Sequence, residues 1–181
     1  MLDLHYWDKT AAFHGHKCPG LAIGFKAAEG AVDLLGLDDA NLPAVDEEIV
    51  CVTENDACCV DAIQVILGCT YGKSNLIPHL RGKMAFSFFN RGTGKGVRLV
   101  LKPDCGAGMD RAGFMEYLVN TPYDQLFDVK EPTFKLPEEA RIFPSHVCAV
   151  CGESTAEYAL RVQDDRYVCV DCYDAYEREG F

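Results

Sequence analysis

The stretch Phe13-His14-Gly15-His16-Lys17-Cys18-Pro19-Gly20 decides how this chain begins to fold. Proline is favoured at the first position of a helix because its missing N–H is not needed there. Pro19 therefore predicts that a helix starts directly after Cys18. Side chains two residues apart share a face in an extended backbone, so His14, His16 and Cys18 would point at one spot. Two imidazoles beside a thiol at a helix N-terminus, where the dipole favours a thiolate, predict a metal site or a reactive thiol.

Apolar periodicity and turn residues outline the rest of the chain. We expect helices over 19–36, 57–67 and 110–120, a buried strand over 48–54, a hairpin of strands 83–90 and 95–102, and a short helix within 122–128. Three prolines within 129–145 predict a linker that carries a short strand. This order predicts an α+β fold, with a mixed helix and sheet core domain over 1–140 and a small second domain over 141–181.

Composition limits the class of protein. The 181 residues carry a net charge of −11 and are 49% hydrophobic, which disfavours a general nucleic-acid binder and suits a globular protein. No apolar run of about 18 residues predicts a membrane span, and no secretory signal is visible at residues 1–20. We therefore expect a cytoplasmic protein with no membrane contact, in which ten cysteines serve as metal ligands or redox groups rather than disulfides.

The acidic charge is unevenly spread. Residues 62–103 contain no Asp or Glu but seven Lys and Arg residues. One interpretation is a surface for an anionic cofactor or an acidic partner, with Lys73, Arg91 and Lys95 as the candidate binding residues. The alternative is that these bases pair with acids elsewhere in the fold or on a second subunit.

The C-terminal segment contains the strongest metal motif. Two C-x-x-C pairs, Cys148 with Cys151 and Cys169 with Cys172, are separated by 17 residues, a spacing typical of structural zinc. Gly152 would let the first pair turn sharply, two strands over 157–162 and 166–168 would follow, and a helix over 171–179 would carry the last ligand. We predict a treble-clef or zinc-ribbon finger. Its eight acidic and three basic residues after position 145 argue against nucleic-acid binding and favour protein contact.

A second cysteine cluster lies in the core domain. Cys58 falls in the first turn of the expected 57–67 helix, for which Asn55 or Asp56 would be the cap, and Asp61 lies three residues later on the same face. If this turn meets the one at Cys18, then His14, His16, Cys18 and Cys58 form a core site that holds a second transition metal or a reactive thiol pair. The remaining thiols are interpreted as small buried hydrophobes: Cys51, Cys59, Cys69 and Cys105.

Four separated motifs resemble those of the E-subunit family of molybdenum or tungsten formylmethanofuran dehydrogenase. They are F-H-G-H-K-C-P-G from Phe13, E-N-D-A-C-C-V-D-A-I-Q from Glu54, G-C-T-Y-G-K-S-N-L from Gly68 and F-F-N-R-G-T-G-K-G-V-R from Phe88. The resemblance covers roughly residues 10–120. It implies an α+β core, a homodimer, partner subunits of a dehydrogenase and a link to one-carbon metabolism of the methanogenesis type. Cys59 is a thiol beyond the family pattern, so the resemblance leaves open whether Cys58 or Cys59 faces the core site.

These patterns leave three hypotheses for function. The first is a metal-binding accessory protein of a formylmethanofuran dehydrogenase-like system, without a complete oxidoreductase active site of its own. The second is a non-enzymatic metal sensor or regulatory adaptor whose finger contacts protein or nucleic acid. The third makes Cys18 and Cys58 a redox or nucleophilic pair that works without a metal.

Overall fold

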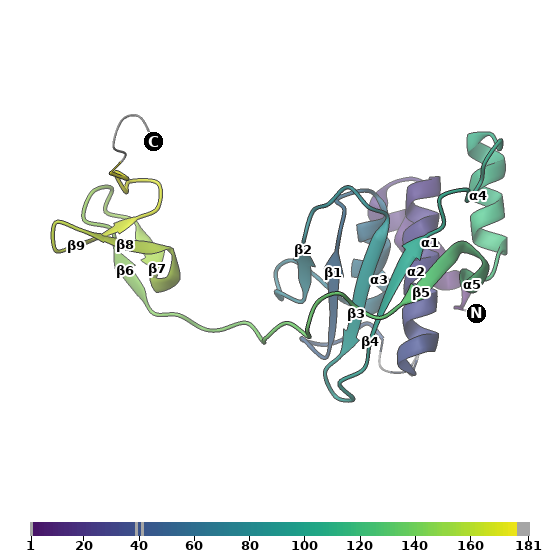
Figure 1. Cartoon of the computed structure of the whole chain (residues 1–181), viewed down its shortest axis with the longest axis horizontal. Helices are drawn as coiled ribbons and strands as arrows, with labels where there is room; N and C mark the ends of the chain where they lie inside the picture. Colours follow the sequence, from purple (N-terminus) through teal and green to yellow (C-terminus); the bar gives the residue numbers. More distant parts are fainter. Residues whose placement is uncertain (1, 39, 41, 177–181) are drawn as a thin grey trace. The chain divides into compact units, whose positions relative to one another are not determined.

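The computed structural model describes residues 2–38, 40 and 42–176. The chain divides into two compact units, residues 1–140 and 141–181 (Figure 1). Each unit has its own hydrophobic cluster. Within the described residues no helix is long and apolar enough to cross a membrane.

The first unit alternates helices with the strands of a single sheet. The elements are α1 (Leu4–His14), α2 (Pro19–Leu35), β1 (Ile49–Thr53), α3 (Cys59–Leu67), β2 (Leu76–Pro78), β3 (Ala85–Asn90), β4 (Gly96–Leu101), α4 (Arg111–Asn120), α5 (Tyr123–Leu126) and β5 (Phe127–Lys130). Local signals set several of these boundaries. Asp110 caps α4 by accepting from the Gly113 N–H, and Gly36 and Gly68 end α2 and α3 in the left-handed conformation.

The sheet has the order β2-β1-β3-β4-β5. Strands β1 and β2 are parallel, while β1–β3, β3–β4 and β4–β5 are antiparallel. The hairpin β3–β4 was predicted. The strand expected in the linker is β5, which instead forms the edge of the main sheet. The structure therefore confirms the mixed α+β class.

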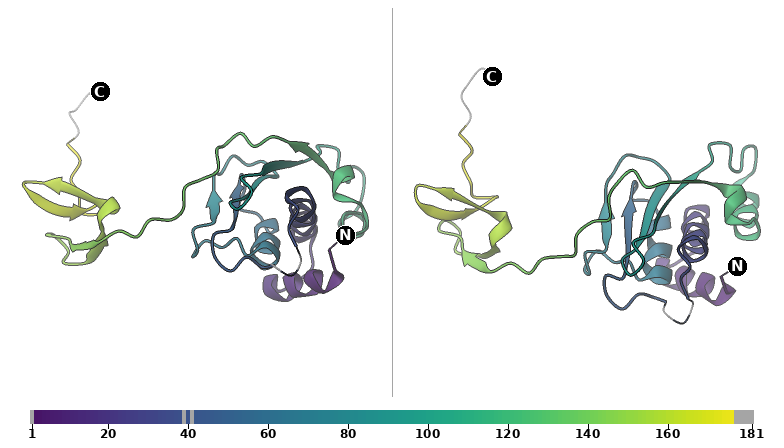
Figure 2. Two further views of the ribbon diagram at one scale, coloured as in Figure 1. Left: turned by 90° about the horizontal axis from the view of Figure 1, so that it is seen from below. Right: turned by 60° about the horizontal axis from the view of Figure 1, so that its bottom comes forward.

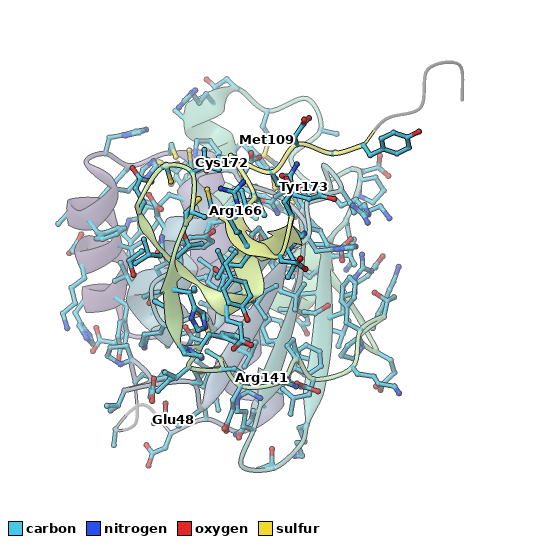
Figure 3. The ribbon with its side chains drawn as sticks, turned by 90° about the vertical axis from the view of Figure 1, so that its left-hand side faces the viewer. Glu48, Met109, Arg141, Arg166, Cys172 and Tyr173 are labelled. Atoms are coloured by element: carbon cyan, nitrogen blue, oxygen red, sulfur yellow. The ribbon has the colours of Figure 1, made fainter. Side chains whose placement is uncertain are left out.

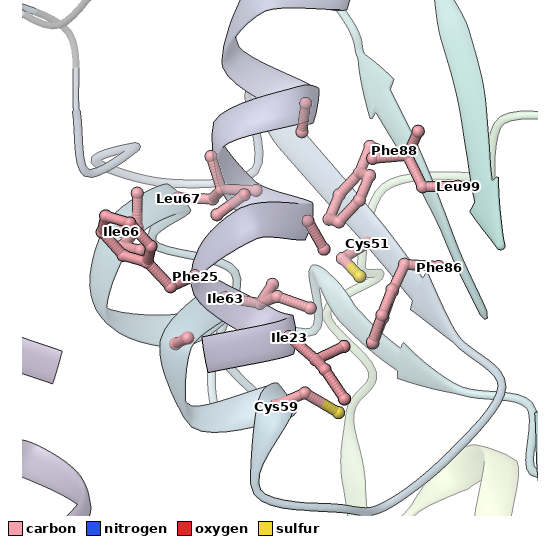
Figure 4. Close-up of a cluster of buried hydrophobic side chains, with 14 of the residues drawn as sticks. Ile23, Phe25, Cys51, Cys59, Ile63, Ile66, Leu67, Phe86, Phe88 and Leu99 are labelled. Carbon is pink, nitrogen blue, oxygen red and sulfur yellow. The ribbon is translucent and has the colours of Figure 1, made fainter. Parts of the chain in front are cut away.

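The main core lies between the sheet and the helices, which cover one face of it (Figures 1 and 2). Helix α2 runs across the sheet and packs closely on α3, with Phe25, Ile63 and Phe86 among the buried side chains (Figure 4). The contact between the two helices depends on Gly24. A Cβ at this position would lie 2.0 Å from the Cys59 carbonyl oxygen, so the helices can approach this closely only because the residue is glycine.

The opposite face of the sheet carries a small apolar cluster of Val50, Val52 and Phe89, against which Phe134 and Leu136 of the linker pack. Arg91 holds this linker segment in place by donating hydrogen bonds to the Pro137 and Glu138 carbonyls. The first part of the expected linker is thus part of the first unit.

The second unit contains two antiparallel strand pairs. Strands β6 (Ser145–Val147) and β7 (Ser154–Ala156) pair, and after the 3-10 turn η2 (Glu157–Ala159), β8 (Leu160–Gln163) pairs with β9 (Arg166–Cys169). The expected helix over 171–179 is absent from 171–176, where the chain forms a turn and then an irregular segment, and 177–179 lie outside the described residues. The two strand pairs and the four cysteines fit a zinc ribbon.

In the second unit the sequence did not predict strands β6 and β7, and the strand expected from residue 157 begins at Leu160. In the first unit it did not predict two elements, and one helix boundary differs. Helix α1, capped by Asp3 and ended by left-handed Gly15, replaces the extended backbone expected before Cys18. Strand β2 has three residues, too few for a periodic signal. Helix α3 begins at Cys59 rather than Ala57, because the Asn55 side chain accepts from the Ala57 N–H and holds a turn ahead of the helix.

Candidate metal centres

Cys18 lies at the N-cap of α2, as the sequence predicted. Its Sγ accepts a hydrogen bond from the Leu21 N–H at 3.3 Å, and the side chain is buried. The thiolate is the form of cysteine that binds metals. The α2 terminus therefore presents the first candidate ligand of a core site.

The two adjacent cysteines at the start of α3 point in different directions. Cys59 is fully buried and donates its S–H to Asn55 Oδ1 at 3.0 Å, and burial raises the pKa of this thiol to about 12. Figure 4 shows it within the core, near Ile23. Cys58 is exposed and lies against α2: a Cβ at Gly20 would be 3.1 Å from the Cys58 Cβ. Cys58, not Cys59, thus faces the core site.

His14 completes the cluster from the end of α1. Its Nε2 lies 3.8 Å from Cys18 Sγ, and its Nδ1 lies 2.6 Å from Asp61 Oδ2. A carboxylate at one ring nitrogen fixes the tautomer with Nδ1–H donating, which leaves the lone pair of Nε2 facing the sulfur. Asp61 Oδ1 also accepts from Gln64 at 3.2 Å, so this carboxylate is held in place on α3.

The ligand atoms of His14, Cys18 and Cys58 all lie within 4.8 Å of one another. In a tetrahedral zinc site the Zn–N and Zn–S bond lengths place a nitrogen and a sulfur about 3.6 Å apart. The observed separation of 3.8 Å between His14 Nε2 and Cys18 Sγ is close to this value. The donor set and the spacing both fit a metal ion with one imidazole and two thiolates as ligands.

His16 is not brought into this cluster. Gly15 adopts φ +90° at the end of α1 and turns the chain, so His14 and His16 do not share the extended geometry that the alternation assumed. The exposed His16 ring lies beside the His14 ring instead, with 4.6 Å between centroids. The sequence predicted the face of the helix on which Asp61 lies but no partner for it. The structure places Asp61 next to the site, in contact with His14.

The thiols of the core site affect one another electrostatically. The pKa of the Cys58 thiol is raised above its usual range by partial burial, by the neighbouring Cys18 sulfur and by the Asp61 carboxylate. If both sulfurs were thiolates, they and the carboxylate would concentrate negative charge in a small volume. A divalent cation at their centre would relieve this repulsion.

The second unit holds the four cysteines of the two C-x-x-C pairs. The sulfurs of Cys148, Cys151, Cys169 and Cys172 lie within 4.8 Å of one another, and those of Cys151 and Cys169 are 3.9 Å apart. Tetrahedral zinc–sulfur geometry requires about 3.8 Å. Gly152, at φ +78°, allows the tight turn after the first pair. Cys172 is labelled on this unit in Figure 3.

Backbone N–H groups donate to the sulfurs of the first pair, Cys148 and Cys151. Hydrogen bonds from the Cys169, Cys151 and Val150 backbone lower the pKa of the Cys148 thiol to about 6. The hydrogen bond with Cys169 raises the pKa of Cys172 to about 12, as expected where neighbouring sulfurs share protons. This cluster could hold a metal such as zinc. A closed set of four sulfurs leaves no position for a substrate, so its role would be structural.

The three candidate anion-binding residues are used differently. Lys73 donates to the Ala44 carbonyl at 2.7 Å, and Arg91 pairs with Glu47 while it binds three backbone carbonyls. Lys95 is exposed in the β3–β4 turn. Arg98, from the same basic window, pairs with buried Glu54 at 2.6 Å. Pairing within the fold thus accounts for much of this window, and anion binding by Lys73, Arg91 and Lys95 stays a prediction.

The other cysteines lie apart from both clusters. Cys51 and Cys69 are fully buried, which matches their interpretation as small apolar residues, while Cys105 is only partly buried. Burial raises the pKa of all three thiols.

Comparisons with known proteins show the family to which the chain belongs. The family model described as FmdE, molybdenum formylmethanofuran dehydrogenase operon, matches residues 13–128. The chain belongs to the FmdE family. The match includes His14, Cys18, Cys58 and Asp61 and ends before the four-cysteine unit.

Two individual proteins are similar over most of the chain. An FmdE-like protein of the tungsten formylmethanofuran dehydrogenase type, from Syntrophus aciditrophicus, has the same fold, with a TM-score of 0.60, 24% identity, and coverage of 93% of this chain and 90% of that one. A probable S-adenosyl-L-methionine-binding protein of Archaeoglobus fulgidus is 29% identical over 93% of this chain. This chain spans 52% of that protein's length.

Proposed function

We propose that this FmdE-family protein carries a functional metal centre in its first unit and a structural zinc ion in its second. One observation carries the proposal: Asp61 binds His14 Nδ1 at 2.6 Å, so Nε2 faces Cys18 Sγ at 3.8 Å and joins Cys58 in one cluster. Carboxylate, imidazole and metal in this order is a recurrent arrangement in zinc proteins. One histidine and two cysteines leave the fourth tetrahedral position for an exchangeable ligand, as in catalytic sites.

The residues of the chain would prepare that position in distinct ways. The metal, when bound, would supply a Lewis acid to a ligand at the fourth position. Cys18 is fixed by the Leu21 N–H, His14 is oriented by Asp61, and Cys58 lies at the solvent-exposed side. A ligand would therefore approach past Cys58.

With this metal centre, the chain serves as an accessory protein of a formylmethanofuran dehydrogenase-like system in one-carbon metabolism. The family match over residues 13–128 and the fold of the Syntrophus protein support that role. We further propose that it acts in the cytoplasm as a homodimer. Light scattering of the purified chain tests the dimer, and a monomer at micromolar concentration would contradict it.

Metal analysis tests the two centres. We expect two equivalents of metal per chain, one equivalent after Cys18→Ala, and one after paired Cys169→Ser and Cys172→Ser substitution. Both variants should keep the near-ultraviolet signal of Trp7, the only tryptophan, which lies in the first unit. Unchanged stoichiometry in Cys18→Ala would remove the core centre and favour the metal-free thiol pair.

The accessory role needs its own assay. Metal-loaded and metal-stripped chain would each be added to a purified formylmethanofuran dehydrogenase. A dehydrogenase whose activity and sedimentation are unaffected by either form would reject the role while leaving the metal centre intact. A sensor or adaptor would then be the better description, and metal-dependent binding of a protein partner by the second unit would support it.

A further inference from the structure

A cavity of about 250 Å³ is lined in part by Asp61, the residue that orients His14 at the candidate metal site. Its floor comes from the segment after β1 and the first turn of α3, including Asp56, Ala57 and Val60. Its other wall comes from Tyr71 and from the end of β2 and the chain after it, including Leu80. The segment 53–61 thus lines the cavity and also supplies Cys58 and Asp61 to the metal site.

The cavity occupies a favoured position in a mixed sheet. Strands β1 and β2 are parallel, and the cavity lies where both end, next to Thr53 and Pro78. In α/β sheets, ligands bind preferentially outside the carboxyl ends of parallel strands, where the following segments diverge. The topology therefore provides a place for a ligand independently of the metal.

Most polar side chains at the cavity are already hydrogen-bonded within the chain, and the exception in the segment after β1 is the Asp56 carboxylate. The Thr53 hydroxyl donates to the Asn55 carbonyl, while the Asn55 side chain donates to the Lys83 carbonyl and accepts from Ala57 N–H and Cys59 S–H. Asp56 is exposed and has no hydrogen bond or ion pair from its side chain within the part of the chain that is described. Asp61 also lines the cavity; its two oxygens accept from His14 Nδ1 and Gln64, and each oxygen keeps a second lone pair for a further donor.

The remaining lining is apolar. Val60, Leu76 and Pro78 form an apolar surface, and two large side chains at the cavity, Tyr71 and Leu80, are 75% and 50% exposed. Among the described residues, none that lines the cavity is basic. A ligand that fits has a compact apolar body and a group that donates hydrogen bonds to carboxylates, and the Tyr71 ring offers a face for a cation or a planar group.

We propose that this cavity binds a small organic cation with an apolar body, of the kind of a primary ammonium on a ring or a short chain. The ammonium group pairs with Asp56 and donates to the carboxylate of Asp61, while the body lies against Val60 and Leu76. Asp61 also orients His14, so Asp61 alone would separate a ligand in the cavity from the metal ligand His14. The binding itself does not rest on the proposed metal function.

Three probes of equal shape and different charge test the proposal: benzylamine, benzyl alcohol and benzoate at neutral pH. Affinities come from titrations followed by ¹H–¹⁵N chemical-shift changes in the full-length chain. We expect benzylamine to bind most tightly and benzoate most weakly, with the largest shifts at Val60 and Tyr71. Asp56→Asn should weaken benzylamine by about two- to fivefold, the range for a partly exposed ion pair, and leave benzyl alcohol unchanged.

Two controls distinguish binding in the cavity from a general charge effect and from coordination to the metal. Asp104→Asn removes the same charge from an exposed residue outside the cavity and should leave all three affinities unchanged. Chelator-treated protein should bind benzylamine as well as metal-loaded protein does, because the contacts are with carboxylates. Binding only to the metal-loaded form would mean that the amine coordinates the metal, and that result overturns the cavity proposal while it supports the metal centre. Equal affinities for benzylamine and benzoate, or an unaltered affinity in Asp56→Asn, also overturn it.

Discussion

The close contact between α2 and α3 makes a sharp prediction for Gly24→Ala. An alanine in a helix interior is ordinarily more stable than glycine by about 1 kcal/mol. Here the new Cβ would lie 2.0 Å from the Cys59 carbonyl oxygen and 2.7 Å from its carbonyl carbon, whereas real Cβ contacts are essentially never under 3.0 Å. The obstacle is backbone, which cannot rotate away, so the helices must separate by about 1 Å.

The expected loss of stability follows from these distances. Overpacking of this kind costs about 3 kcal/mol, the upper end of the usual range, because the clash is with main chain. After the gain in helix propensity, the net loss is about 2 kcal/mol. For a protein of this length that corresponds to a fall in Tm of about 4–8 °C. Because Trp7 is the only tryptophan and is buried in the first unit, its fluorescence reports on that unit alone.

The same displacement should damage the core metal site. Cys58 directly precedes Cys59, and a shift of about 1 Å is several times the tolerance of a metal–ligand distance. Core metal affinity, measured by competition with a chromophoric chelator, should therefore fall together with Tm. Gly30→Ala is the matched control: its Cβ would meet the Leu99 and Tyr123 side chains at 2.9 Å, so stability should fall while metal affinity is kept. A Gly24→Ala protein as stable as wild type would refute the reasoning.

Three further predictions concern single side chains. Asp61→Asn should weaken metal binding at the core site by about 10–100-fold, the usual cost of losing a partner of a ligating histidine, and should leave the metal of the second unit in place, as metal analysis at graded chelator concentrations would show. Cys148→Ser should release the metal of the second unit and unfold that unit, visible as exchange of the β8–β9 amides, while the Trp7 transition stays unchanged. Glu54 has a pKa lowered by the hydrogen bond from Arg98, so its stabilisation is present above its usual pKa near 4.5 and is lost as pH falls through the lower folded-state pKa. The free energy of unfolding of Glu54→Gln should therefore fall less steeply as the pH is lowered through the acid range. An unchanged acid dependence would show that other carboxylates control it.

The sequence predicted best those features that a single local signal determines. Pro19 and Cys18 marked the start of α2, Gly68 marked the end of α3, and Asp110 marked the start of α4, because a cap or a proline acts within one turn of the backbone. Gly152 is a further local signal, because its positive φ allows the tight turn after Cys151.

What the sequence could not show depends on packing between distant segments. His14 and Asp61 are 47 residues apart, and only the packing of α1 on α3 brings their side chains together. The orientation of Cys58 and Cys59 depends on where α3 begins, which the Asn55 turn shifts by two residues from the expected position. The extended backbone predicted from His14 to Cys18 was wrong because α1 has little amphipathic pattern, although Asp3 and Gly15 were available as its cap and its end.

The negative charge of the core site connects the proposed metal with the proposed ligand. Cys18 and Cys58 lie at the N-termini of α2 and α3, and the pKa of the Cys58 thiol is raised first by partial burial and then by the neighbouring Cys18 sulfur. A divalent cation would balance two thiolates and leave neutral His14 as the third ligand. The charge of Asp61 then has no counter-charge among the described residues beyond its hydrogen bonds, and Asp56 lies next to the cavity with no partner among them. The metal would balance the two thiolates, and a cationic ligand in the cavity would balance the carboxylates of Asp56 and Asp61. We therefore expect one molecule to bind the metal and the ligand at the same time.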